Sequence, residues 1–174
     1  MIKLPAQRVT LVDNLNNLTT EWYKSLLLLT RSVNNSRFTS SGSVATVTGT
    51  TSPTVAATIP VNMGNGGSVR LSVGLSSTNN ANVKSLIVKL GSTTIQTYAI
   101  DPSTDTQTAQ IFIVGRGAND QYTTNLPSVN CVGSGGTEST EDASGNINIT
   151  LSVQLANAAD SVSVESWLLE VEQS

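Results

Sequence analysis

The chain has 174 residues, of which 38% are hydrophobic, 4% aromatic and only 12% charged, and its net charge is −3 at pH 7. Its nine Lys and Arg residues form no basic cluster, which argues against nucleic-acid binding because that binding requires neutralisation of phosphates. No apolar run approaches the roughly 20 residues of a membrane span. The N-terminus lacks the apolar segment of a signal peptide, so we expect a protein that is made in the cytoplasm and does not insert into membranes.

The residue types needed for common catalytic chemistry are scarce. The chain contains no histidine and a single cysteine, Cys131. Histidine is the commonest general base and metal ligand, so the many Ser and Thr hydroxyls lack the base that usually activates them, and a zinc site would need carboxylates alone. Cys131 lies in a strand-like context, where a free thiol usually behaves as a small core residue. We therefore predict that the protein is not an enzyme and holds no cofactor.

Acidic residues gather in two parts of the sequence. One group shares a long loop and the other lies in two neighbouring loops: Glu138, Glu141 and Asp142, and Asp101, Asp105 and Asp120. Calcium binds oxygen ligands of this kind, but the spacing from Asp101 to Asp105 is not that of an EF-hand. We expect a solvated acidic surface in preference to a calcium site.

Residues 1–17 have the pattern of an extended arm. Pro5 disfavours a helix, and the apolar residues Leu4, Val9 and Leu11 are dispersed among polar ones. Such a segment cannot build a core of its own and tends to be disordered or to lie on a partner. We predict that Leu4, Pro5, Val9 and Leu11 anchor the chain to another protein.

Residues 18–33 form the one convincing helical pattern in the sequence. Apolar residues recur at spacings of four, three and four, which places them on one face of a helix, whereas Leu28 lies off that face. A helix of about sixteen residues is marginal alone. We expect it to pack against copies of itself or another protein, the alternative being that it lies across one end of its own β-domain. The predicted docking face consists of Trp22, Tyr23, Leu26, Leu27, Leu29 and Val33.

The remainder of the chain is rich in strand patterns. A polar segment over 34–42 is predicted to be a linker, and from 43 to 174 short strands alternate with turn residues without any helical pattern. This favours an antiparallel sandwich over a parallel sheet. We predict a mainly β fold, an antiparallel jelly-roll-like β-sandwich preceded by an extended arm and one amphipathic α-helix. Strands are expected near residues 44–47, 55–59, 69–75, 83–90, 94–100, 107–114, 126–132, 147–155 and 162–171.

Three of these segments carry further expectations. The dipeptide Gly91-Ser92 between two strand patterns predicts a hairpin. The unbroken apolar run from Ile111 to Val114 predicts a strand buried on both faces. In the last strand, apolar residues occupy both alternating registers after Trp167. We therefore expect one face of the last strand to contact the core and the other to contact a neighbouring molecule.

Two long polar loops, 76–82 and 133–145, are predicted to be flexible connections that packing does not need. Loops on a rigid sandwich are also common sites of ligand recognition. Carbohydrate recognition by the loops at 76–82 and 116–125 is therefore an alternative function.

The N-terminal segment also carries a resemblance to known proteins. Residues 4–13 (LPAQRVTLVD) and 18–27 (LTTEWYKSLL) combine a proline-containing arm with a Glu-Trp-Tyr helix start. They resemble the N-termini of small virion proteins of tailed bacteriophages, although Asn-Leu-Asn-Asn replaces the typical Gly after the Val-Asp turn. The resemblance covers residues 4–33. It implies that this segment trimerises or docks on the particle while a distal β-domain faces outward.

The leading hypothesis is therefore a structural component of a tailed-phage virion, most simply a short trimeric tail fibre attached through its N-terminal arm. Its expected partners are further copies of itself in a homotrimer, other virion proteins and host-surface glycan. Its expected location is the virion. The alternatives are a capsid decoration or cement protein and a carbohydrate-binding module for host recognition.

Overall fold

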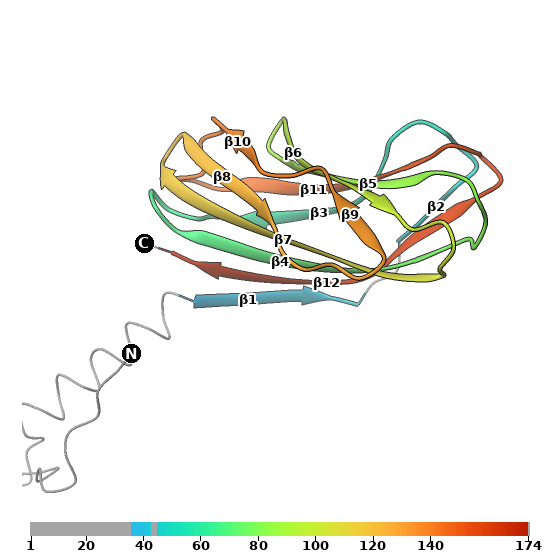
Figure 1. Cartoon of the computed structure of the whole chain (residues 1–174). Coiled ribbons are helices and arrows are strands. Elements are labelled where there is room, and N and C mark those ends of the chain that lie inside the picture. Colours follow the sequence, from blue (N-terminus) through green and yellow to red (C-terminus); the bar gives the residue numbers. More distant parts are fainter. Residues whose placement is uncertain (1–35, 43–44, 174) are drawn as a thin grey trace, which may run out of the picture. The chain divides into compact units, whose positions relative to one another are not determined.

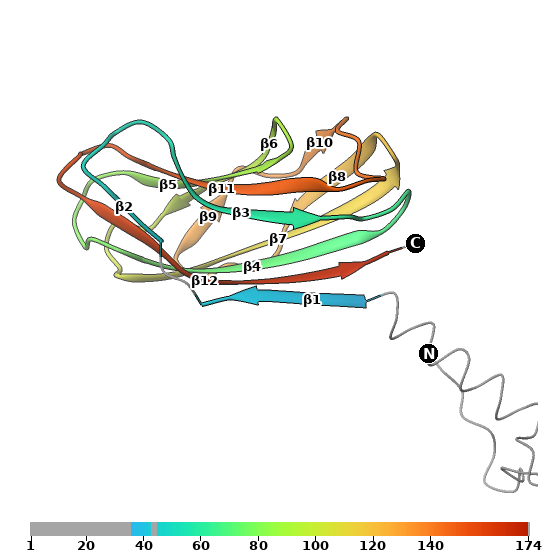
Figure 2. The same cartoon turned by 180° about the vertical axis from the view of Figure 1, so that it is seen from behind.

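The computed structural model describes residues 36–42 and 45–173. These residues form two antiparallel β-sheets that face each other, which Figures 1 and 2 show from opposite sides. The predicted β-sandwich is therefore confirmed. The predicted arm over 1–17 and helix over 18–33 lie outside the described residues. The strands are β1 (Ser36–Ser41), β2 (Ala45–Thr48), β3 (Thr54–Val61), β4 (Ser68–Ser77), β5 (Lys84–Leu90), β6 (Thr93–Ile100), β7 (Thr106–Gly117), β8 (Asp120–Asn125), β9 (Cys131–Gly133), β10 (Thr137–Ser139), β11 (Ile147–Leu155) and β12 (Ser161–Glu172).

The two sheets differ in size. The larger sheet has the order β1-β12-β4-β7-β8-β10, and β2 also pairs with β12. The smaller sheet has the order β3-β11-β5-β6-β9. Within the described chain, β5–β6 and β7–β8 are consecutive strands paired in one sheet, and the β5–β6 turn at Gly91-Ser92 confirms the predicted hairpin. Most other connections cross between the sheets, so strands that are distant in sequence become neighbours.

The core lies between the two inner faces. In β4, Val69, Leu71 and Val73 alternate inward, and they pair with β12 on one side and β7 on the other. From the smaller sheet, Leu151 and Val153 of β11 face them in the same buried cluster. Each such aliphatic side chain contributes about 1.5–3 kcal/mol when it is removed from water. The strict alternation in the sequence is the direct cause of this arrangement, because successive strand residues point to opposite faces.

The last strand departs from the prediction because it contains a β-bulge. The register between β12 and β4 shifts between Val164 and Ser166, which leaves Glu165 as the extra residue. A bulge moves all following side chains to the other face. Val164 before it and Leu169 after it therefore both reach the core. In the other register after the bulge, Leu168 stays on the outer face and is 48% exposed, so contact of this face with a neighbouring molecule stays a prediction.

Two further predictions about strands need correction. Ile111 and Ile113 of β7 are buried, whereas Phe112 and Val114 are half-buried on the outer face, so the strand is not buried on both faces. The strand expected over 126–132 is reduced to β9, because Pro127 removes a ladder donor and Asn130 adopts a left-handed conformation with φ of 55°. A strand, β8, occupies part of the segment 116–125 that was expected to be a loop.

Segments predicted as linker or flexible loop are also ordered into the sandwich. Part of the predicted linker over 34–42 is strand β1, which pairs with β12 at the edge of the larger sheet. The loop over 133–145 contains β10 and the buried Ala143, whose N–H donates to the carbonyl of Ala118 at 2.9 Å. That Ala143 carbonyl in turn accepts from the N–H of Met63 at 3.3 Å. These contacts fix both segments by backbone hydrogen bonds.

Cys131 is buried at 8% exposure, as predicted. Burial raises the pKa of its thiol to about 11, with a further contribution from the charge of Asp101. A protonated thiol is a poor nucleophile and metal ligand, so Cys131 acts as a core residue. In the part of the chain that the structure describes, no helix has the length and hydrophobicity to cross a membrane.

Candidate functional site

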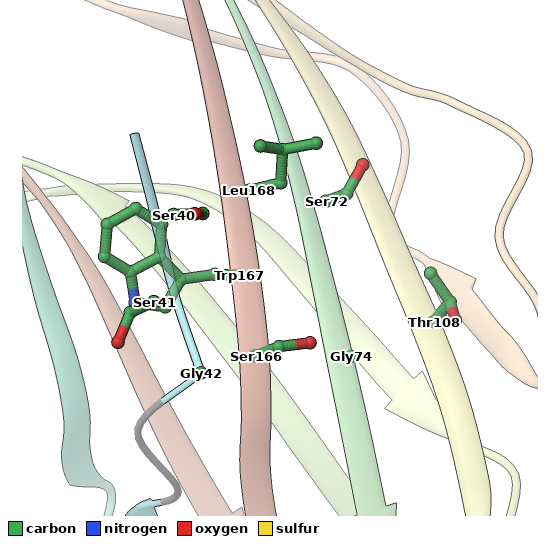
Figure 3. A pocket seen from close by; sticks show the side chains of 9 residues that line it. All are labelled: Ser40, Ser41, Gly42, Ser72, Gly74, Thr108, Ser166, Trp167 and Leu168. Carbon is green, nitrogen blue, oxygen red and sulfur yellow. The ribbon is translucent and has the colours of Figure 1, made fainter. Parts of the chain in front are cut away.

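A groove of about 450 Å³ lies along β12, between the end of β1 and the neighbouring strands of the larger sheet, and Figure 3 shows it from close by. We call it the outer groove. Its lining residues are mostly small hydroxyl-bearing or glycine residues, with two large apolar ones. They are Ser40, Ser41, Gly42, Ser72, Gly74, Thr108, Ser166, Trp167 and Leu168.

Strand register explains how the groove is built. Gly74 lies between Ser166 of β12 and Thr108 of β7, and Ser72 lies opposite Leu168. A Cβ at Gly74 would stand 2.8 Å from the Ser166 Oγ, so a larger residue would fill the floor of the groove. The bulge at Glu165 determines which of these side chains face outward.

The outer groove has the chemistry of a site for a neutral, polar ligand. None of its nine lining residues carries a titratable side chain. Ser and Thr hydroxyls can both donate and accept hydrogen bonds, and Leu168, which is 48% exposed, offers an apolar surface. The half-buried Trp167 ring is directed toward β1 in Figure 3 and also packs against the core. Acid–base chemistry has no residue to perform it within the groove. Its groups can instead hydrogen-bond a hydroxylated molecule.

The carboxylates that the sequence analysis singled out serve mainly as turn and hairpin acceptors. Asp101 accepts from the N–H and Oγ of Ser103 at 2.9 and 2.6 Å, and Asp142 makes the same pair of bonds to Ser144 at 3.0 and 2.6 Å. These bonds lower the pKa of both carboxyls, because they favour the charged form. Each carboxylate is thus held by its own turn.

Glu141 forms hydrogen bonds between two segments that are distant in the sequence. Its Oε1 accepts from the N–H and Oγ of Ser92 at 2.9 and 2.6 Å and from the Thr93 Oγ1 at 2.8 Å. The hydrogen bonds from Ser92 and then Thr93 lower the pKa of Glu141. This carboxylate therefore fixes the segment after β10 to the β5–β6 hairpin.

Two of the remaining acidic residues of these loops, Asp120 and Glu138, lie beside one arginine. The Arg116 Nη2 lies 2.7 Å from Asp120 Oδ1 and 2.9 Å from Glu138 Oε1, and the guanidinium lies 5.6 Å from the centroid of the Tyr122 ring. All of these groups are substantially exposed. Among the described residues, no three or more Cys, Asp or Glu side chains come close enough together to hold a metal ion.

None of the sequence-predicted site residues is among the residues that the structure describes. The predicted docking face (Trp22, Tyr23, Leu26, Leu27, Leu29 and Val33) and the predicted anchoring residues (Leu4, Pro5, Val9 and Leu11) lie outside the described residues. The outer groove, in contrast, was not predicted. Its residues come from four strands and from Gly42 after β1, and apart from Trp167 and Leu168 each is an ordinary serine, threonine or glycine in its local sequence.

Comparisons with known proteins give the following. No family model matches the chain, and no curated protein matches its sequence. Lectin I from Ulex europaeus, solved with the methyl glycoside of α-L-fucose, is 8% identical with a TM-score of 0.35, over 79% of this chain and 92% of that chain. Peanut lectin with a nine-residue peptide is 9% identical with a TM-score of 0.36, over 79% and 91%. Lectin II from Ulex europaeus is 12% identical with a TM-score of 0.39, over 79% and 93%. At these values the matches assign neither a family nor a function.

Proposed function

We propose that the chain is a non-enzymatic structural protein of a tailed-phage virion, most simply a short trimeric tail fibre that attaches through residues 1–17 and associates through residues 18–33. The supporting observation is that the sandwich completes its own core. Residues 37–174 form one compact unit, and its buried apolar cluster is drawn from both sheets, from Val47 to Val171. A core of this kind does not require the apolar helix face, which supports a role for that face in association.

The strand order supports the finer assignment of the β-domain as a jelly roll. Without β1 and the short β8, β9 and β10, the two sheets read β2-β12-β4-β7 and β3-β11-β5-β6. This is the arrangement of eight strands in two interlocked Greek keys, an architecture found in viral capsid and lectin domains. Because one fold hosts many functions, the order supports an exposed particle domain without assigning its ligand.

Sedimentation of the full chain tests the association. We expect a trimer at micromolar concentration, a monomer for Leu26→Asp on the predicted docking face, and a trimer for Leu28→Asp, which lies off that face. The charge in Leu26→Asp would have to be buried between helices, which is costly. A monomeric wild-type chain, or equal behaviour of the two variants, would remove association by this helix.

Removal of residues 1–17 separates a tail fibre from a capsid decoration protein. Virions assembled with the shortened chain are expected to lack it at the tail, while capsid stability is unchanged. Loss of the chain from the capsid shell, together with a weaker shell, would establish the decoration alternative instead. Imaging of the particles reads out both outcomes.

The outer groove favours carbohydrate recognition as a second candidate function. Its hydroxyls and the half-buried Trp167 fit a hydroxylated, uncharged ligand. We expect glycan-array binding by the full chain that is lost in Gly74→Gln, whose side chain fills the groove floor, and kept in Gly145→Gln, where a Cβ meets nothing within 4 Å. An array without any bound glycan, or binding that survives Gly74→Gln, would remove the groove as a glycan site.

A further inference from the structure

A completely buried lysine lies at one end of the sandwich. Lys84 is the first residue of β5 and is 0% exposed. Its Nζ donates to the Asn80 Oδ1 at 2.8 Å and to the backbone carbonyl of Asn82 at 3.1 Å. None of the ion pairs of the described residues includes Lys84. The amine therefore contacts neutral oxygens only, and a buried ammonium in that position costs free energy that an uncharged nitrogen does not.

The amide that Lys84 contacts is held on both of its polar atoms. The Asn80 Oδ1 accepts from Lys84 and also from the N–H of Asn82 at 3.0 Å. The Asn80 Nδ2 donates to the Asp160 Oδ1 at 2.6 Å. The backbone N–H of Asn80 donates to the carbonyl of Pro102 at 3.0 Å, so the loop that carries the amide is itself fixed.

Asp160 completes the cluster from the other side. It is only 2% exposed, and within the described residues its Oδ2 has no hydrogen-bond partner although it is buried. A buried carboxylate oxygen without a hydrogen-bond donor costs free energy, and it leaves one oxygen of Asp160 available as an acceptor. The β11–β12 turn positions it, since the Asp160 N–H donates to the carbonyl of Asn157 at 3.1 Å.

These three side chains form the parts of an acyl-transfer site. Lys84 supplies a nucleophile in contact with an amide, the Asn82 N–H stabilises charge on the amide oxygen, and Asp160 touches the leaving nitrogen as an acid–base group. We propose that Lys84 and Asn80 form an intramolecular isopeptide bond, promoted by Asp160.

The reaction balances without any external reactant. One proton of the Lys84 ammonium reaches Asp160 through the Asn80 amide, whose Oδ1 accepts from Nζ and whose Nδ2 donates to the Asp160 Oδ1. The freed Nζ electron pair attacks Cγ of Asn80. The oxygen of the tetrahedral intermediate accepts a hydrogen bond from the Asn82 N–H. A second Nζ proton passes to Nδ2, the Cγ–Nδ2 bond breaks, and ammonia leaves and takes up the proton held by Asp160. A lysine ammonium and an amide thus become a secondary amide and an ammonium ion, with no change in oxidation state. Formation of the bond removes the buried charge of Lys84. The proposal of this bond does not depend on the function proposed above.

Mass spectrometry of the purified full chain tests the bond. We expect an intact mass lower than that of the sequence by one ammonia (about 17 Da), as the condensation requires. Trypsin is expected to fail to cleave after Lys84, and fragmentation of the resulting peptide is expected to join Asn80 to Lys84. The Lys84→Met variant keeps a long buried side chain and should show the full mass, whereas Lys89→Met on the same strand should keep the deficit.

The variants also separate other sources of the same deficit. Cyclisation of an asparagine before glycine, such as Asn65, loses the same mass but would persist in Lys84→Met, which would overturn the proposal. An unmodified wild-type chain with normal tryptic cleavage after Lys84 would overturn it as well. A deficit of about 18 Da, the loss of water in a condensation with a carboxyl, would show that Asp160 is the acyl partner and would overturn the assignment to Asn80. In Asp160→Ala, checked for folding by circular dichroism, we expect a slower or absent loss.

Discussion

The two ends of the sandwich hold their polar groups in opposite ways. At the loop end, made of residues 77–84, 101–105 and 156–161, Lys84 and Asp160 are buried and are connected through the Asn80 amide. At the hairpin end, made of residues 62–67, 91–92, 116–120 and 140–146, Arg116 and its carboxylate partners are exposed. Figure 1 places the β4–β5 loop and the β7–β8 hairpin at these opposite ends.

Burial decides how much each set of contacts contributes. An exposed ion pair competes with water and is screened by salt, so its contribution to stability is small. A buried polar group that loses its partner pays the full cost of desolvation. The loop end, which contains the predicted flexible loop over 76–82, is therefore held more firmly than the hairpin end. The Thr78 N–H donates to the Ser161 carbonyl, and the Ser161 N–H donates back to the Thr78 Oγ1, at 3.0 and 2.9 Å.

The largest effect is expected from the backbone of the hairpin end, and not from its charges. A Cβ at Gly67 would lie under 3.0 Å from the carbonyl oxygens of Met63 and Glu172, neither of which can move without the strands that carry them. We expect Gly67→Ala to lower the free energy of unfolding by about 3 kcal/mol or more, measured by urea unfolding. Gly145→Ala is the control, since a Cβ there meets nothing within 4 Å. Equal stability of the two variants would show that the close backbone approach is unimportant.

The next largest effect is expected at the loop end. Asp160→Ala, in which we expect the Asn80 amide to stay unreacted, removes the acceptor of that amide, and a buried donor left without a partner costs about 1–3 kcal/mol. The control Asp142→Ala removes an exposed carboxylate that bonds only to its own turn, at Ser144. We expect a clearly larger loss of the free energy of unfolding for Asp160→Ala, with proteolysis appearing first within residues 78–83. If both variants lose the same free energy of unfolding, burial does not distinguish the two ends.

Much of the sandwich could be predicted because its signal is local. Strand β11 runs from Ile147 to Leu155, the range that its alternation predicts, since a period of two requires no knowledge of the partner strand. The turn at Gly91 could be predicted for a similar reason. Its φ of 58° suits glycine, and the dipeptide Gly91-Ser92 is a hairpin signal on its own.

The rest could not be predicted because it depends on pairing between distant strands. The bulge at Glu165 is defined only against β4, and its side chain accepts a hydrogen bond from the Ser76 Oγ. Without the bulge, the alternation in β12 assigns Trp167 and Leu169 to the wrong face. Strand β1 could not be predicted either, because its mostly polar residues form a strand only by pairing with β12.

The candidate sites also differ in whether a local sequence signal could have predicted them. The outer groove assembles Ser72, Thr108 and Ser166 from three strands, and no local pattern distinguishes them from other surface residues. The cluster of Lys84, Asn80 and Asp160 could have been suspected from one feature of the sequence. Lys84 occupies the inward register of an otherwise apolar strand, in step with Leu86 and Val88, and a charged residue at such a position is seldom buried without a specific partner.

A smaller, pH-dependent effect is expected at the hairpin end from Glu141. Hydrogen bonds from Ser92 and then Thr93 hold its pKa below the ordinary value of 4.5. A carboxyl whose pKa is lower in the folded state adds stability above its unfolded value, and this is lost as the pH falls through the folded value. We expect Glu141→Gln to be less stable than wild type at pH 7 and equal to it well below pH 4.5, as measured by thermal unfolding. A difference that persists unchanged at low pH would show that the ionised form is not what the hairpin binds.

The smallest effect is expected from Arg116, although it has the most conspicuous contacts. Its guanidinium reaches Asp120, Glu138 and the Tyr122 ring, but all of them are open to water, and the attraction between such charges is screened at high ionic strength. We expect Arg116→Ala to shift the melting temperature less than Asp160→Ala does, and the shift to shrink further in concentrated salt. Because Arg70 pairs with Glu170 on an exposed sheet face at 3.9 Å, Arg70→Ala should behave in the same way and serves as the matched control. A large shift for Arg116→Ala that salt leaves unchanged would mean that the ring contact with Tyr122, and not the ion pairs, stabilises this end.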